Sequence, residues 1–153
     1  MIVFRLSKSA YAKDLSGRGA EISGGRWNSK GTALVYTGQS RALCTTEIAV
    51  HTPLGIIPAD YEIISIEIPD SIPIEELAET DLPADWRSFP HAAGPQEIGD
   101  RFVHAGKSAV LKVPSVVVQG EFNYLINPRH EDAIQVRIKE REPFNFDERL
   151  FIK

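Results

Sequence analysis

The sequence predicts an α+β fold in which a few helices accompany a core of mixed or antiparallel strands. Short apolar segments of strand length outnumber the segments with helical periodicity, and only two of the latter are long enough for helices. A length of 153 residues, with 42% hydrophobic and 25% charged residues, is typical of one globular domain. The chain has no internal repeat and no low-complexity segment. We therefore expect residues 1–153 to form a single domain.

The first half of the chain contains three segments with the composition of strands. IVFRL and ALVYT are short apolar runs, and YEIISIEI alternates in the manner of a half-buried strand. The polar, glycine-rich segment between the first two is expected to be mostly loop, with about one helical turn. The expected strands span residues 2–6, 33–37 and 61–68.

A helix is expected from Arg41 to about Thr52. Ser40 is suited to be its N-cap, because a serine oxygen can accept a hydrogen bond from a free N–H group of the first turn. Pro53 and Gly55 follow the last turn and end the helix.

The second half contains more strands than helices. Prolines and a tryptophan between residues 74 and 94 predict a short helix followed by a loop, and Gln96–Lys107 has the pattern of a second helix. The polar and aromatic segment 119–132 is expected to be a connection. Further strands are expected at residues 109–113, 115–118, 133–140 and 146–152.

The composition excludes several classes of protein. One cysteine, Cys44, cannot form a disulfide within the chain, and this count fits a reducing, cytoplasmic setting. The N-terminus lacks the apolar core of a signal peptide, and no segment approaches the roughly 20 apolar residues of a membrane span. The net charge is −4 and no dense basic patch occurs. We therefore expect no membrane association and no direct nucleic-acid binding.

Common nucleotide-binding and metal-binding motifs are absent. The Gly-Lys-Ser at 106–108 lacks the earlier glycine of a P-loop, because Arg101 occupies that position. The four histidines and the single cysteine have no metal-ligand spacing, so we expect no metal.

The stretch GGRWNSKGTALVYTG, residues 24–38, is the first candidate for a binding site. Arg26 lies between a glycine pair and Trp27, and an arginine fork held by a glycine turn suits a phosphate group. Asn28, Ser29 and Lys30 add further donors. The alternatives are a surface arginine in a flexible loop and an indole that covers one edge of the core.

Glu47 is the second candidate. On the expected helix its neighbours at three and four residues include Leu43, Cys44 and Val50, which places the carboxylate on the apolar face. A buried carboxylate needs partners and often marks an active site. The alternative is a partly exposed glutamate that pairs with Arg41 or a nearby lysine.

Other polar residues follow the later apolar runs. Tyr36, in the strand before the helix, could stack on a flat ligand or lie in the core. Ser115 follows a proline at a bend between two apolar runs. Asn123, Asn127 and His130 lie in the aromatic-rich connection, where Asn127 precedes a proline as in turns.

These stretches together resemble the RES domain, a family named for an arginine, a glutamate and a serine. The resemblance rests on GGRWNSKG, on ALVYTG, on the helix that carries Glu47 and His51, and on VPSVVVQGEFNYLINPRH. It extends over nearly the whole chain. The family residues correspond to Arg26, Tyr36, Glu47, Ser115, Asn123 and Asn127.

The resemblance implies an ADP-ribosyltransferase-like core with NAD as the substrate. Cleavage of the nicotinamide–ribose bond builds positive charge on the ribose, which a carboxylate at Glu47 would stabilise. Arg26 would hold the diphosphate and Tyr36 the nicotinamide ring. Trp27, Ser115 and Asn123 would complete the substrate-binding site.

The resemblance also implies a biological setting. Such a chain would be the toxin of a bacterial toxin–antitoxin pair, silenced by an Xre-like antitoxin in a hetero-oligomer. The acceptor of the ADP-ribosyl group stays open between water, phosphate and a protein side chain. The alternative is a module that binds a nucleotide without cleaving it, or an inactive subunit.

Overall fold

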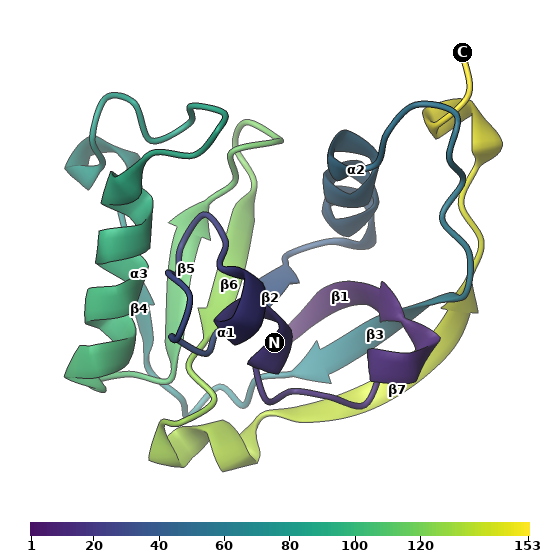
Figure 1. Ribbon diagram of the computed structural model, residues 1–153. Coiled ribbons are helices and arrows are strands. Elements are labelled where there is room, and N and C mark those ends of the chain that lie inside the picture. The colour runs from purple at the N-terminus through teal and green to yellow at the C-terminus, as the bar shows by residue number, and fades with distance from the viewer.

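The computed structural model describes residues 1–153 and contains one mixed sheet of seven strands, in the order β4-β5-β6-β2-β1-β3-β7 (Figure 1). Only β4 and β5 pair in parallel, and all other neighbours are antiparallel. The α+β fold predicted from the sequence is therefore confirmed. The strands are β1 (Ile2–Lys8), β2 (Val35–Gly38), β3 (Tyr61–Glu67), β4 (Ile74–Glu76), β5 (Val110–Pro114), β6 (Phe122–Ile126) and β7 (Arg137–Phe144).

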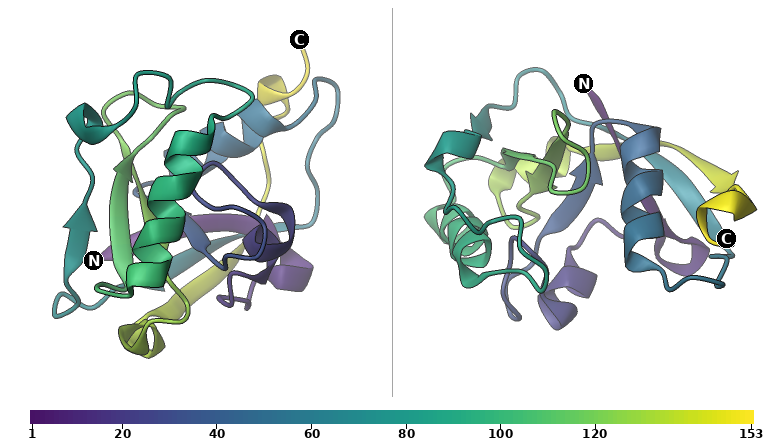
Figure 2. Two further views of the ribbon diagram at one scale, coloured as in Figure 1. Left: turned by 60° about the vertical axis from the view of Figure 1, so that its left-hand side comes forward. Right: turned by 90° about the horizontal axis from the view of Figure 1, so that it is seen from above.

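Three α-helices accompany the sheet. They are α1 (Arg18–Ser23), α2 (Arg41–His51) and α3 (Ala93–Ala105). Helix α3 covers one face of the sheet half that contains β5 and β6, and α2 lies beside β1 and β2 (Figures 1 and 2). None of these helices has the length and apolarity needed to cross a bilayer.

The sheet divides between β1 and β2. The two strands pair at one position, Phe4 with Gly38, whereas β1 pairs with β3 along its whole length. In Figure 1, β5 and β6 run steeply while β1, β3 and β7 cross the view. Because the hydrogen-bonded ladder between β1 and β2 ends after one residue pair, the two strands separate there, and side chains from both can line the gap.

Two apolar clusters pack against the sheet. One contains Val3, Val35, Ile64 and Ile66 on β1, β2 and β3 and extends to residues of β5 and β6. The other joins α3 to β5 and β6 and includes both tryptophans of the chain.

The helix from Ser40 onward agrees closely with its prediction. Ser40 Oγ accepts a hydrogen bond from Leu43 N at 3.0 Å, and the helix ends at His51, one residue before the predicted end. The glycine at 106, in the rejected P-loop, ends α3 in the left-handed conformation. That Gly-Lys-Ser is thus a helix C-terminus followed by a strand.

Two predicted strands are wrong. Residues 115–118 form a turn, because Ser115 Oγ accepts hydrogen bonds from the N–H groups of Val117 and Val118 at 3.1 and 3.0 Å. Residues 146–152 contain a short 3-10 helix in place of a strand, since Asp147 caps the turn by accepting from Arg149 N.

The boundaries of other elements differ from those expected, and two strands, β6 and β4, were not predicted. The expected connection 119–132 contains β6, a central strand, and the strand expected at 133–140 begins four residues later, after a 3-10 helix. The expected short helix after residue 74 is β4 followed by a 3-10 turn. Helix α1 is longer than the single turn expected there.

Candidate functional site

The largest cleft, of about 590 Å³, adjoins the point where the sheet divides. It gathers Arg26, Trp27, Tyr36, Glu47 and Asn123, which lie on four separate segments of the chain. Ser115 is the one residue of the predicted site that does not line this cleft.

Gly38 allows α2 to approach the sheet closely. A Cβ atom there would lie 3.0 Å from Cys44 Sγ and 3.4 Å from Leu43. These two buried residues form the inward face of α2. Because the helix packs so near β2, Glu47 on its next turn reaches the edge of the cleft.

Glu47 is half-buried and is paired with an amide instead of a cation. Its Oε1 accepts a hydrogen bond from Asn123 Nδ2 at 2.7 Å, while Arg41 pairs with Glu142. Burial raises the pKa of Glu47, and the hydrogen bond from Asn123 opposes this shift. The nearby Glu121 raises the pKa further.

Asn123 connects the three elements that meet at the cleft. It is buried on β6, and its Nδ2 donates both to Thr37 O on β2, at 3.1 Å, and to the Glu47 carboxylate. The amide thereby fixes the direction in which the carboxylate points. This position was expected to lie in a loop, whereas it lies in strand β6, where it lines the cleft and orients Glu47.

Arg26 is half-buried at another wall of the cleft. Its Nη1 donates to the backbone carbonyls of Trp86 and Ser88 at 2.8 and 3.1 Å. Burial lowers the pKa of the guanidinium. Because both acceptors are carbonyl groups, no carboxylate neutralises this positive charge.

Tyr36 lines the cleft with its ring and uses its hydroxyl inside the protein. The hydroxyl donates to Asn28 Oδ1 at 2.6 Å and accepts from Trp27 N at 3.0 Å. Burial raises its pKa. A Cβ on Gly25 would lie 2.7 Å from the hydroxyl oxygen, so the glycine pair lets the loop approach Tyr36. Asn28 is fully buried, and it is therefore unavailable as a donor to a ligand.

Trp27 and Ser115 have mainly structural surroundings. Trp27 is 3% exposed and packs on Trp86 with ring centroids 6.2 Å apart, although part of it reaches the cleft. Ser115 is buried, and it lines a second cavity, of about 430 Å³, on the other side of the 115–121 turn. Val116 and Val117 of that turn line the main cleft. Asn127 forms the expected turn, accepting from Arg129 N at 3.0 Å.

Two residues near the cleft did not emerge from the sequence. Arg5 is half-buried on β1 between two smaller cavities that both share Tyr36 with the cleft, and burial lowers its pKa. An arginine inside the apolar run IVFRL was a usable signal. Phe89 lines the cleft with 83% of its surface exposed, but nothing in its sequence context distinguishes it from an ordinary loop residue.

The fold and the cleft define an α+β protein with a candidate ligand site at the division of its sheet. A chain of the MbcT–MbcA toxin–antitoxin complex of M. tuberculosis has the same fold, with a TM-score of 0.74 and 20% identity. The superposition covers 98% of this chain and 86% of that one. No group of three or more His, Cys, Asp or Glu side chains is arranged to hold a metal ion.

Comparison of sequences defines the family. The RES domain model matches residues 2–147. A protein of Sphingobium sp. named Prs ADP-ribosylating toxin is 38% identical over 96% of this chain and 92% of its own length. Toxin Res of Yersinia enterocolitica is 39% identical over 98% of this chain and 99% of its own length. Toxin Res of Pseudomonas putida is 36% identical over 99% of this chain and 100% of its own length. The chain belongs to the RES domain family.

Proposed function

We propose that this chain is an NAD-consuming toxin, acting as one domain, that cleaves the bond between nicotinamide and ribose. The observation that carries the proposal is the half-buried carboxylate of Glu47, which faces a cleft that also contains Arg26 and Tyr36. The name of the Sphingobium relative, an ADP-ribosylating toxin, supports NAD as the substrate.

Glu47 is assigned the catalytic role. When the glycosidic bond breaks, nicotinamide leaves with the bonding electron pair and the ribose becomes an oxocarbenium-like cation. A carboxylate in partly apolar surroundings stabilises that cation more strongly than one in water. Asn123 holds the carboxylate in place through its 2.7 Å hydrogen bond.

Arg26 is assigned the diphosphate. Its Nη1 donates to two carbonyl oxygens, of Trp86 and Ser88, which fixes the guanidinium and leaves its other N–H groups for charge-assisted bonds to phosphate oxygens. Tyr36 and Trp27 offer aromatic surface to the flat rings of the dinucleotide. Ser115 is assigned a structural role: its hydroxyl holds the turn that places Val116 and Val117 in the cleft wall.

The products identify the acceptor. The protein is incubated with NAD, with and without inorganic phosphate, and the products are separated by chromatography and mass spectrometry. Free ADP-ribose indicates transfer to water, a phosphorylated ADP-ribose indicates phosphorolysis, and a mass increase on protein indicates ADP-ribosylation. Unchanged NAD in every condition, with NAD binding retained, would favour a module that only binds the nucleotide.

An antitoxin partner follows from this activity, since an enzyme that destroys NAD harms the cell that makes it. The structural relative comes from a toxin–antitoxin complex, which supports a partner of this kind. We assign inhibition to an Xre-like antitoxin whose terminus fills the cleft between Arg26 and Glu47. Operator DNA binding is assigned to that partner, because this chain has a net charge of −4.

Purification of the two proteins together tests this inhibition. The full complex should not consume NAD, and an antitoxin shortened at its terminus should bind without inhibiting. A full complex that turns over NAD as fast as the free chain would rule out occupation of the cleft.

A further inference from the structure

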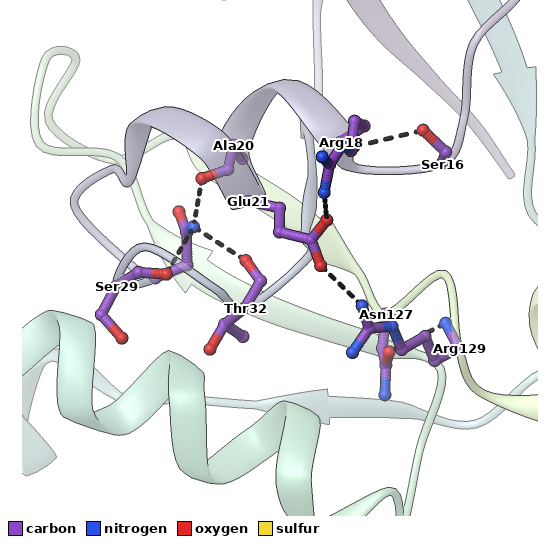
Figure 3. A network of polar contacts seen from close by, with 9 residues as sticks. Ser16, Arg18, Ala20, Glu21, Ser29, Thr32, Asn127 and Arg129 are labelled. Carbon is purple, nitrogen blue, oxygen red and sulfur yellow. Dashed lines mark hydrogen bonds and ion pairs between the residues drawn. The ribbon is translucent and has the colours of Figure 1, made fainter.

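The loop that carries Arg26 is built around a fully buried asparagine. Asn28 is 0% exposed, and its Nδ2 donates to Ala20 O, Thr32 O and Ser29 O at 2.8, 3.0 and 3.3 Å. Figure 3 shows these three carbonyl groups converging between α1 and the following loop. The amide oxygen of the same side chain accepts a hydrogen bond from the Tyr36 hydroxyl. One amide thus fixes both the loop backbone and the aromatic ring of the cleft.

Helix α3 holds the same loop from the other side. Asp100 accepts from both Ser29 N, at 3.0 Å, and Ser29 Oγ, at 2.5 Å. Gln96 Nε2 donates to Gly25 O at 2.9 Å and to Asn28 O at 3.2 Å. A Cβ on Gly99 would overlap the carbonyl oxygen of Trp27, so helix and loop lie backbone against backbone with no space for a side chain between them.

Neither Asn28 nor Asp100 lines the cleft. Any effect of these residues on a ligand therefore acts through Tyr36 and the loop residues that do line the cleft, Arg26 among them. Two glycines precede Arg26, and a glycine loop without such bonds would lose much conformational freedom when a ligand ordered it. The hydrogen bonds that Asn28 donates and Asp100 accepts remove that freedom before the ligand arrives.

We propose that Asn28 and Asp100 are positioning residues that pre-order the 24–29 loop, so that Arg26 and Tyr36 face the cleft in the arrangement that binds substrate. The proposal deepens the proposed function and rests on it for the identity of the ligand. The ordering of the loop can be measured by hydrogen exchange in the absence of NAD turnover.

The variant Asp100→Ala separates positioning from folding, because Asp100 is only half-buried. Hydrogen exchange at the Ser29 amide should accelerate, since that amide loses its acceptor. With NAD, kcat/KM should fall roughly 10- to 100-fold, mainly through KM, because a displaced Arg26 weakens binding before chemistry. Asp100→Asn keeps one oxygen acceptor and should recover part of the loss.

Two further variants complete the experiment. Glu97→Gln, exposed on the same helix, is the matched control and should leave exchange and KM unchanged. Asn28→Asp puts an oxygen where the amide nitrogen faces three carbonyls, and it should both lower the melting temperature and raise KM.

Different results overturn different claims. A folded Asp100→Ala protein with parental KM, or with parental exchange at Ser29, overturns the positioning role. Failure of the parent protein to consume or bind NAD overturns the proposed function, and the exchange data then judge the ordering of the loop by themselves.

Discussion

Replacing Glu47 by glutamine removes the carboxylate charge of the cleft and nearly preserves its shape. The hydrogen bond from Asn123 Nδ2, 2.7 Å long, needs only an oxygen acceptor, and the glutamine amide supplies one. The contact between α2 and β6 should therefore survive in Glu47→Gln. Any loss of rate then reports the charge itself.

The expected loss follows from Coulomb's law. A full negative charge about 4 Å from the developing ribosyl cation contributes on the order of 4 kcal/mol at an effective dielectric constant of about 20. At about 1.4 kcal/mol per factor of ten, this corresponds to roughly 10³ in kcat. Water entering the open cleft screens part of the interaction, so the decrease should be at least about 10²-fold. The affinity for NAD should change little, because the ground state carries no ribosyl cation.

The same substitution should not destabilise the protein. Burial raises the pKa of Glu47, so the stability linked to its titration is present below the unfolded pKa and is lost as pH rises through the folded pKa. At neutral pH the ionised carboxylate is therefore unfavourable in the folded state. The melting temperature of the glutamine variant should equal or exceed that of the parent.

The assay compares kcat from NAD consumption, the Kd for NAD and the melting temperature in parent and variant. A Glu47→Gln protein that turns over NAD at the parental rate would show that Glu47 is structural, and the charge-stabilisation mechanism would be wrong. A variant that loses activity together with stability would instead place the effect in folding.

Four further outcomes are expected. As the pH falls through the raised pKa of Glu47, kcat should decrease, and this decrease should occur above pH 4.5, the ordinary pKa of a glutamate. The acidic limb of a plot of kcat against pH measures it. Asn123→Ala removes the hydrogen bond that lowers this pKa, so the limb should move to higher pH, and an unmoved limb would contradict the assignment. Arg26→Lys loses the planar, two-pronged donor set that suits a diphosphate and should weaken NAD affinity in calorimetry, whereas equal affinity would move the diphosphate elsewhere. Gly99→Ala should lower the free energy of unfolding by at least about 1–3 kcal/mol, because the added methyl group overpacks the contact, and its melting temperature should fall. The control Gly19→Ala, whose Cβ meets open space, should keep the parental melting temperature.

Local signals in the sequence were sufficient for the elements whose stability is local. Helix α2 was predicted because its cap at Ser40 and its apolar periodicity are both contained within a few residues. Strand β3 was predicted from its alternating, isoleucine-rich run, although residues 63–66 are buried on both faces and the strand is not half-buried as expected. The helical periodicity of α2 also placed Glu47 on the inward face of that helix.

Strand β6 could not be found in this way. Its Asn123 indicates a loop when the sequence is considered locally, yet the residue is buried because Thr37 O and the Glu47 carboxylate, 86 and 76 residues away, accept its hydrogen bonds. The run after Ser115 had the opposite problem, since valines suggest a strand while one serine hydroxyl bends the backbone. In both cases a polar group decided the structure through a partner that composition does not reveal.

The sequence determined which chemical groups this protein can bring to a substrate: an arginine on a glycine loop, an aromatic ring and a carboxylate on an amphipathic helix. The tertiary structure decided how those groups are held. Arg26 donates hydrogen bonds to carbonyl groups some 60 residues further along the chain, and the Tyr36 hydroxyl donates one to the buried Asn28. Hydrogen bonds between distant segments exist only once the sheet has assembled, because the segments that supply donor and acceptor meet only there.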